Sequence, residues 1–317
     1  MTEPSDVVRG VLRGSGLDRH ATAVAARNGR GARVVVATGE LPRGTAVSGA
    51  TVMYGASLAK QVIGVLVASL VREGRLDIED GLRRHVPELP AWADGVRVRH
   101  LLHHTSGLPD IDPPPDRLGR ATEGGWDNAA AMRALGGRDA PARAPGRVHA
   151  YSNIGYVCLA EIVRRTGEEP LPGAAERRLF RSFGMTRSLL GDRPEGVPAR
   201  YPAPPATIGD GGLWTTAEDL LRWNEALNAR VLGDDVHALV ESPGRLDDGT
   251  PLDYAWGMTR TRRGGAWTYT HGGTWPAWCA KAVRRPDDGS AVALLTSCDD
   301  VPRVSEAALV ILDRLSG

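Results

Sequence analysis

The sequence is poor in lysine. Of its 39 lysine and arginine residues only two are lysines, Lys60 and Lys281. Arginine keeps its proton in proteins, whereas a lysine amine can give its proton up. A chain that uses arginine for nearly every cation and keeps a lysine at a defined position therefore points to chemistry that needs a deprotonatable amine there.

Other features are also missing, and each excludes a class of protein. The three cysteines, Cys158, Cys279 and Cys298, are an odd number without a CxxC pair, so no disulfide framework is implied. The net charge of +1 without a basic cluster argues against binding to nucleic acid or to an anionic membrane. No apolar run is long enough to span a bilayer, and the first twenty residues lack the apolar core of a signal peptide. We therefore expect a cytoplasmic protein, and the sequence specifies no oligomeric partner.

Metal ligands are missing too. His100, His103 and His104 have helical spacing, but no HExxH motif, acidic third ligand or cysteine accompanies them. We interpret them as helix-end and packing residues and expect neither a metal nor another cofactor.

The stretch Gly55–Lys60 and the apolar run 61–72 after it predict a helix that is buried on all sides and ends at Gly74. Ser57 and Lys60 would lie in its first turn, on one face. Free N–H groups at a helix start stabilise developing negative charge. The same positive end and burial disfavour a protonated lysine, so a neutral Lys60 amine could take the Ser57 proton. The alternative is a surface lysine at a helix start.

Two further motifs carry polar groups. Tyr151 and Asn153, two residues apart in an extended segment, would project to one side, where a phenol can relay a proton and an amide can hold a carbonyl. Their alternative is a helix cap beside a core tyrosine. His271-Gly272-Gly273 joins or interrupts two predicted strands, and paired glycines permit close approach of another backbone or of a substrate. The alternative there is a tight turn.

The remaining pattern predicts an α+β fold. Strands are expected at 21–27 and 32–38, joined by an Asn-Gly hairpin turn, and later at 254–261, 266–270, 278–284 and 290–297. Helical patterns cover 127–135, 154–166, 217–227 (with Thr216 as N-cap) and 304–315, with a helical block broken by prolines between 76 and 105. An irregular exposed loop is expected at 109–125, and a boundary at 194–205. We predict one sheet layer from residues 1–75 and 207–317, and an all-α insertion at 76–206.

Ser57-x-x-Lys60, Tyr151-x-Asn153 and His271-Gly272-Gly273, in this order, resemble the motifs of the penicillin-recognising serine hydrolases. The stretches 99–108, 145–156 and 209–220 are similar to family sequences as well. The branch that this chain resembles contains class C β-lactamases, D,D-carboxypeptidases and related esterases. The resemblance implies a β-lactamase/transpeptidase-like fold: an antiparallel sheet flanked by terminal helices, a helical domain, and the active site in the cleft between them.

The resemblance also implies roles. Ser57 would be the nucleophile and Lys60 would share or take its proton. Tyr151 would act as general base and then as acid toward the leaving group. Asn153 would bind the substrate carbonyl side, His271 would take the first position of the third motif with Gly272 and Gly273 after it, and the backbone amides of Ser57 and Thr274 would form the oxyanion hole.

Two departures from the family pattern bear on the substrate. His271 stands where β-lactamases usually present a lysine to a substrate carboxylate, and a histidine is only partly charged near neutral pH. Trp275 and Trp278 follow the motif and would make the cleft more apolar, unless they serve sheet packing instead.

We therefore expect an acyl-Ser57 hydrolase, an esterase or amidase for a small ester, amide or thioester. The alternatives are a transacylase that passes the acyl group to an amine or alcohol, a true β-lactamase, and a non-catalytic sensor on the same fold. An α/β-hydrolase is disfavoured for two reasons. Gly55-x-Ser57-x-Ala59 matches its motif only in degenerate form, and a serine so early in the chain leaves little room for the strands that precede the nucleophile in that fold.

Overall fold

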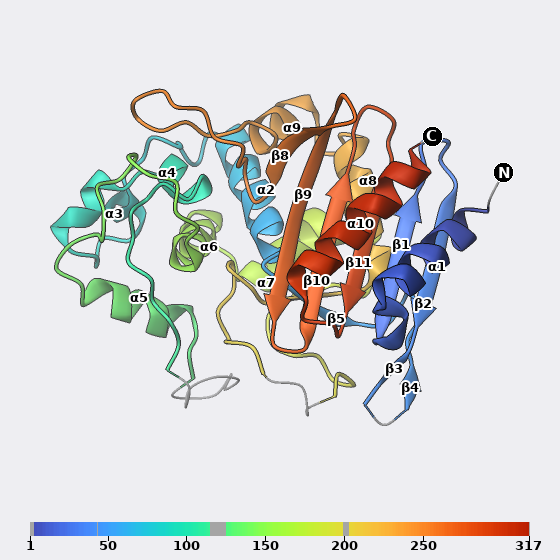
Figure 1. The fold of residues 1–317 in the computed structure, drawn as a ribbon. Helices are drawn as coiled ribbons and strands as arrows, with labels where there is room; N and C mark the ends of the chain where they lie inside the picture. Colours follow the sequence, from blue (N-terminus) through green and yellow to red (C-terminus); the bar gives the residue numbers. More distant parts are fainter. Residues whose placement is uncertain (1–2, 43, 115–124, 199–202, 317) are drawn as a thin grey trace.

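The computed structural model describes residues 3–42, 44–114, 125–198 and 203–316 (Figure 1). Its larger sheet has six antiparallel strands in the order β2-β1-β11-β10-β9-β8, so the two ends of the chain meet in one sheet. The strands are β1 (Thr22–Arg27), β2 (Arg33–Thr38), β8 (Thr259–Arg263), β9 (Ala266–Trp275), β10 (Trp278–Arg284) and β11 (Ala291–Thr296).

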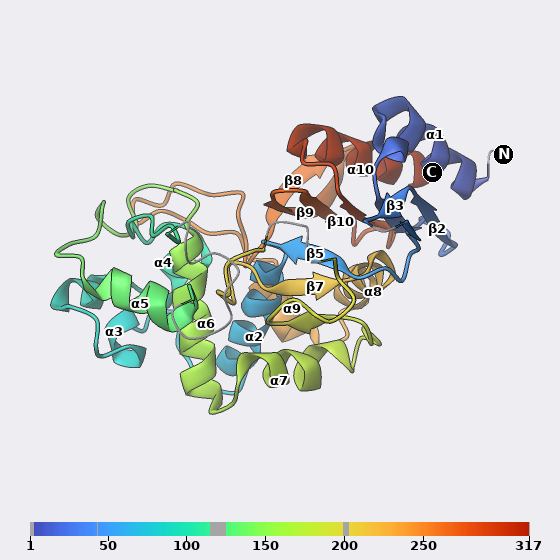
Figure 2. The same ribbon diagram turned by 90° about the horizontal axis from the view of Figure 1, so that it is seen from below.

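Helices cover both faces of this sheet (Figure 2). Alternate residues of β1 and β11 belong to two different cores, as a side-chain period of two requires: Val24 and Val292 pack with α1 and α10, whereas Ala25 and Ala293 face α2 and α8. The small alanines let α8 lie close to the sheet. The helices of the two layers are α1 (Pro4–Ser15) and α10 (Val301–Leu315) on one face, and α2 (Ala59–Arg72), α8 (Ala217–Asn228) and α9 (Asp234–Val240) on the other.

A second, three-stranded sheet has the order β5-β7-β6 and leads directly to the site. Strand β5 (Met53–Ala56) ends at Ser57, and β7 (Leu213–Thr215) pairs with it in antiparallel register. Strand β6 (Leu189–Leu190) lies within 76–206, so the predicted all-α insertion contains one short strand. The domain boundaries themselves stay a prediction. A two-stranded ribbon, β3 (Glu40–Leu41) and β4 (Thr45–Ala46), lies apart.

Helices α3 to α6 form a group beside the sheet layers (Figure 1). Their bounds are α3 (Leu82–His85), α4 (Val98–Leu102), α5 (Asn128–Gly136) and α6 (Asn153–Gly167). Helix α7 (Leu171–Ala175) lies against β6, α6 and α2 instead. Short turns of other helix types lie at 17–19, 91–95 and 176–180. α6 is buried along most of its length and packs against α2, α4 and α5. It therefore joins the helical group to the central helix.

The structure corrects three predictions of secondary structure. The predicted strand at 254–261 begins only at Thr259, because a turn closed by the Ala255 N–Met258 O bond, with Gly257 at φ 84°, precedes it. β9 does not stop at Thr270 but continues through the His-Gly-Gly motif to Trp275. α10 begins at Val301, where the Asp300 side chain accepts a bond from the Arg303 amide. The hairpin, the buried helix and the Thr216 cap are confirmed.

Part of the expected loop at 109–125 and of the expected boundary at 194–205 lies outside the described residues. Within the described ranges, no helix combines the length and the apolar character needed to cross a lipid bilayer.

Candidate active site

The backbone turns sharply just before Ser57. A register shift in the β5–β7 pair falls between Tyr54 and Ala56, and Ala56 has φ 46°, which costs energy for a residue with a Cβ. Helix α2 begins at Ala59, so Ser57 precedes the helix and does not lie in its first turn as predicted. The bulge and the strained residue aim the half-buried Ser57 out of the sheet toward the cleft.

Lys60 is fully buried, and its Nζ atom lies at the centre of the site. Its Nζ donates to Ser57 Oγ at 3.1 Å, to Asn153 Oδ1 at 2.8 Å and to the Asp210 backbone carbonyl at 2.8 Å. These three partners match the three N–H donors of an ammonium group. The alternative interpretation, a lysine on the surface, is therefore wrong. The Nζ atom of Lys60 joins α2 to α6 and to the loop before β7.

Strand β9 packs closely against the backbone turn at Ser57, and the residue of β9 at the contact is a glycine. A Cβ at Gly273 would lie 2.1 Å from Gly55 O and 3.0 Å from Ser57 N, whereas a Cβ at Gly272 would point to the other face and meet nothing nearer than 3.5 Å. The close approach expected of the glycine pair therefore belongs to Gly273. The Ser57 amide donates no hydrogen bond to another described residue, and the next residue of β9, Thr274, is exposed.

Tyr151 and Asn153 flank the N-cap of α6, and both face Lys60. Ser152 is the cap itself, accepting from the Gly155 amide, so the helix-cap interpretation holds for the middle residue of the motif. Asn153 reaches Lys60 directly, but Tyr151 presents its ring, with the centroid 4.8 Å from Lys60 Nζ. The Tyr151 hydroxyl makes no hydrogen bond to any described residue, and the side chain is 46% exposed.

His271 is buried beside this group, and its ring nitrogens are both engaged. Nδ1 lies 2.6 Å from Gly272 O, an acceptor, so Nδ1 carries the proton; Nε2 then accepts from the Tyr254 hydroxyl at 3.0 Å. Burial, with the nearby Lys60 charge, lowers the pKa of His271 to about 3. The expectation of a partly charged imidazole near neutral pH is therefore wrong, because the ring is shielded from water.

The structure adds His104 to the site. Its ring centroid lies 4.3 Å from that of Tyr151, its Nδ1 accepts from the Ser152 amide at 3.1 Å, and its carbonyl accepts from the Ala150 amide. His104 thus holds the Tyr151 segment on both sides. In the sequence, this role of His104 was indicated solely by the similarity of the stretch 99–108 to family sequences. His100 and His103 are a helix-cap and a packing residue, as predicted.

The cleft at Ser57 has a volume of about 140 Å³ and an aromatic wall that includes Tyr54, Trp126 and Trp275. Trp278, by contrast, is fully buried and packs edge-on against Trp214, so it serves the core. Two aspartates that the sequence did not single out, Asp112 and Asp210, also line this cleft.

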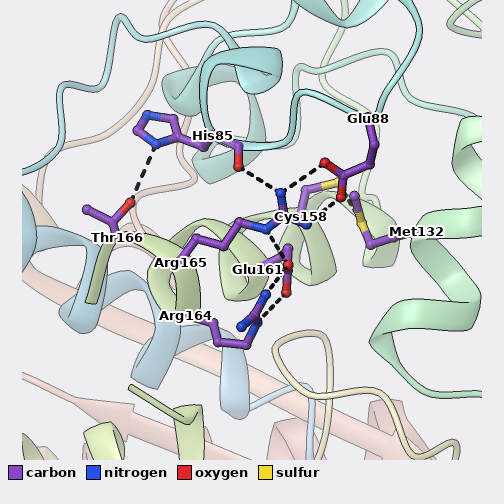
Figure 3. A network of polar contacts seen from close by, with 8 residues as sticks. All are labelled: His85, Glu88, Met132, Cys158, Glu161, Arg164, Arg165 and Thr166. Atoms are coloured by element: carbon purple, nitrogen blue, oxygen red, sulfur yellow. Dashed lines mark hydrogen bonds and ion pairs between the residues drawn. The ribbon is translucent and has the colours of Figure 1, made fainter. Parts of the chain in front are cut away.

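A larger cavity, of about 810 Å³, lies between α5, α6, the start of α7 and residues 206–208, away from Ser57. On its charged wall, Arg164 and Arg165 both bind Glu161, and Arg165 also binds Glu88 (Figure 3). The smaller cleft is the chemically equipped one, because it contains Ser57 and Asn153. Within the described ranges, no group of three His, Cys, Asp or Glu side chains gathers as metal ligands would.

Known proteins are similar to this chain in sequence and in fold. The sequence model of the Beta-lactamase family matches residues 8–315. A penicillin-binding protein of Bacillus subtilis is 26% identical over 80% of this chain and 62% of its own length. The D-alanyl-D-alanine-carboxypeptidase/endopeptidase AmpH of Escherichia coli is 27% identical over 53% of this chain and 46% of its own length. The chain thus spans about half to three fifths of these relatives.

Solved structures share the fold. The D-amino acid amidase of Ochrobactrum anthropi, in complex with L-phenylalanine, superposes with a TM-score of 0.81 at 20% identity and covers 98% of both chains. The octameric penicillin-binding protein homologue of Pyrococcus abyssi gives a TM-score of 0.80 at 18% identity, over 99% of this chain and 77% of its own. With the family match over nearly all of the sequence, the chain belongs to the β-lactamase family of serine hydrolases.

Proposed function

We propose that this protein is an acyl-transfer hydrolase that forms a covalent acyl-Ser57 intermediate on a small ester or amide. The observation that carries this proposal is the contact of the buried Lys60 Nζ with Ser57 Oγ, Asn153 and the Asp210 carbonyl. A buried lysine beside a serine has a chemical use, since it can accept and return the serine proton.

In the first step Ser57 Oγ attacks the carbonyl carbon, and its proton passes to Lys60 in the neutral amine form, in which Nζ has a lone pair in place of one N–H donor. If Lys60 is instead an ammonium group, it takes the Ser57 proton while it passes one of its own protons to a deprotonated Tyr151. The Ser57 and Thr274 amides receive the oxyanion, and the Asn153 side chain binds beside the acyl carbonyl. The proton then goes to the leaving alcohol or amine as its bond to carbon breaks. Water attacks the acyl-Ser57 ester in the second step, and the carboxylic acid leaves. Transfer to an amine or alcohol in place of water stays a prediction, as does a cytoplasmic location.

The state of His271 favours esters and amides over carboxylate-bearing β-lactams. A neutral imidazole with both nitrogens occupied offers no charge to a substrate carboxylate. The fold neighbours include a D-amino acid amidase, a protein named for amide hydrolysis, which supports an amide as substrate here.

The test uses a fluorophosphonate and a panel of p-nitrophenyl esters, amino-acid amides and a chromogenic cephalosporin. We expect one label per chain, on Ser57, and an acyl-enzyme visible by intact mass. Ser57→Ala should lose the label and all turnover, while the matched control Ser48→Ala, an exposed serine, keeps both. Labelling at another serine, or faster turnover of the cephalosporin than of short esters at neutral pH, would contradict the proposal.

A further inference from the structure

The charged side chains that line the Ser57 cleft are of one sign. Among the described residues, the lining contains two carboxylates, Asp112 and Asp210, and no lysine, arginine or histidine side chain. Lys60 lies beneath the floor, with its three donors used. A substrate that enters this cleft therefore meets negative charge on the wall, which repels a carboxylate and attracts a cation.

The Asp210 loop is held rigidly. A Cβ at Gly209 would lie 2.5 Å from Tyr156 O, and one at Gly211 would lie 2.6 Å from the Tyr54 hydroxyl, so the backbone on both sides of Asp210 is packed against α6 and β5. The Asp210 carbonyl is fixed by Lys60 at 2.8 Å. The side chain between these anchors is thus placed before any substrate arrives, which lowers the ordering cost of binding.

One oxygen of this carboxylate is left without a partner. Asp210 Oδ1 is buried and accepts no hydrogen bond from any described residue. The carboxylate also lies close enough to the buried Tyr54 to add to the effect of burial, which raises the pKa of that phenol. A buried carboxylate oxygen without a donor is unfavourable, and a bound cationic N–H group would supply the missing donor.

Aromatic rings stand around the same space. Trp126, Trp275 and Tyr54 line the cleft together with Asp210, and ring faces attract an ammonium group as well as hydrocarbon. The lining is therefore complementary to an acyl group that carries both a positive charge and an apolar part.

We propose that the acyl part of the substrate carries a protonated amine, as in an aminoacyl ester or amide, and that Asp210 binds this amine. The inference rests on the proposed acyl-Ser57 chemistry and adds the substrate class. A second explanation of Asp210 is that its charge merely offsets that of Lys60, although no ion pair joins the two side chains within the described chain. The two explanations differ in what they predict for charged and neutral substrates.

The experiment compares two amides of almost identical shape, the p-nitroanilides of alanine (both enantiomers) and of isobutyric acid. They differ only in an ammonium group that replaces a methyl group. We expect kcat/KM of the wild-type protein to favour one alanine enantiomer over the isobutyryl compound. Asp210→Asn should lower this preference by about tenfold to a hundredfold, the range for a hydrogen bond to a charged group, mainly through KM. Asp210→Glu should keep part of the preference, and added salt should weaken it in the wild type.

The control is Asp112→Asn, at an exposed position of the cleft rim, which should change the preference by less than about threefold, as surface charges do. If Asp210→Asn lowers kcat/KM equally for both substrates, so that their ratio is unchanged, the proposal is overturned and the counter-charge explanation is favoured. Fluorophosphonate labelling of Ser57 separates this failure from a failure of the proposed function: labelled protein with an unchanged ratio refutes only the role of Asp210, whereas absence of labelling in the wild type refutes the acyl-enzyme itself.

Discussion

Replacing Gly273 tests the close contact on which the oxyanion hole depends. A Cβ at this position would lie 2.1 Å from Gly55 O and 3.0 Å from Ser57 N. Carbon–oxygen contacts are ordinarily about 3.3 Å or longer, so β9 must retreat by roughly 1 Å from the Ser57 turn. A displacement of that size can cost about a hundredfold in rate, and the loss of one oxyanion donor costs about 10²–10³ in kcat. Gly273→Ala should therefore lower kcat by at least about a hundredfold, measured on the best ester of the panel.

The adjacent glycine supplies the matched control. A Cβ at Gly272 would face the other side of the sheet, 3.5 Å from Ala280 O and 4.0 Å from Lys281 Nζ, both ordinary contacts. Gly272→Ala should thus cost far less activity, and it should raise stability by about 0.5–1 kcal/mol because alanine is better than glycine in a strand. Both variants should fold, which circular dichroism and thermal melting would verify. A Gly273→Ala enzyme within tenfold of wild type, or equal losses in the two variants, would refute the reasoning.

Two further predictions concern buried titratable groups. Lys60→Arg should be nearly as inactive as Lys60→Ala, because arginine does not release its proton and its planar fork does not fit the space around Nζ; an arginine variant with more than about a tenth of wild-type kcat would make Lys60 a structural cation. Burial lowers the pKa of His237, which is fully buried in α9, to about 4. As the pH falls below about 6.5, His237 binds a proton in the unfolded chain but not yet in the folded protein. The free energy of unfolding therefore keeps its full value above about pH 6.5 and decreases toward pH 4. In urea unfolding between pH 7.5 and pH 5, His237→Phe should reduce this loss by up to about 1.4 kcal/mol per pH unit below pH 6.5; an identical pH dependence in both proteins would contradict the assignment.

Much of the fold follows from local signals in the sequence. The Asn-Gly turn set the first hairpin, Thr216 capped α8, and the apolar run 61–72 formed the buried helix. Ser57 and Lys60 came together because three residues span less than one helical turn, even though the helix starts two residues later than predicted. Where residues close together in the sequence determine the local structure, the sequence alone is sufficient to predict it.

Tertiary contacts decided the features that the sequence did not reveal. The His-Gly-Gly motif runs straight through β9 because β10 pairs with it as far as Trp275, a partner that lies on another segment. The strand at 254–261 is cut short because Tyr254 turns inward to His271 and the Gly257 backbone packs on Lys60. The residue pattern did not predict the N-terminal helix α1, which only the resemblance implied as a terminal helix; its apolar residues are buried against α10 and β2, two segments that lie elsewhere in the sequence.

His271 shows most clearly why residue type does not determine charge. In the sequence, a histidine at the third motif suggests a group that titrates near neutral pH. In the fold, it is 7% exposed, its acceptor nitrogen is satisfied by the Tyr254 hydroxyl, and the neighbouring Lys60 opposes a second positive charge. A cation here would have no carboxylate partner among the described residues, so the neutral ring is the stable one. With this position uncharged, the charge that a substrate meets in the cleft comes mainly from Asp210, because Asp112 is exposed to solvent, and Asp210 becomes the residue through which selectivity for a charged acyl group can be measured.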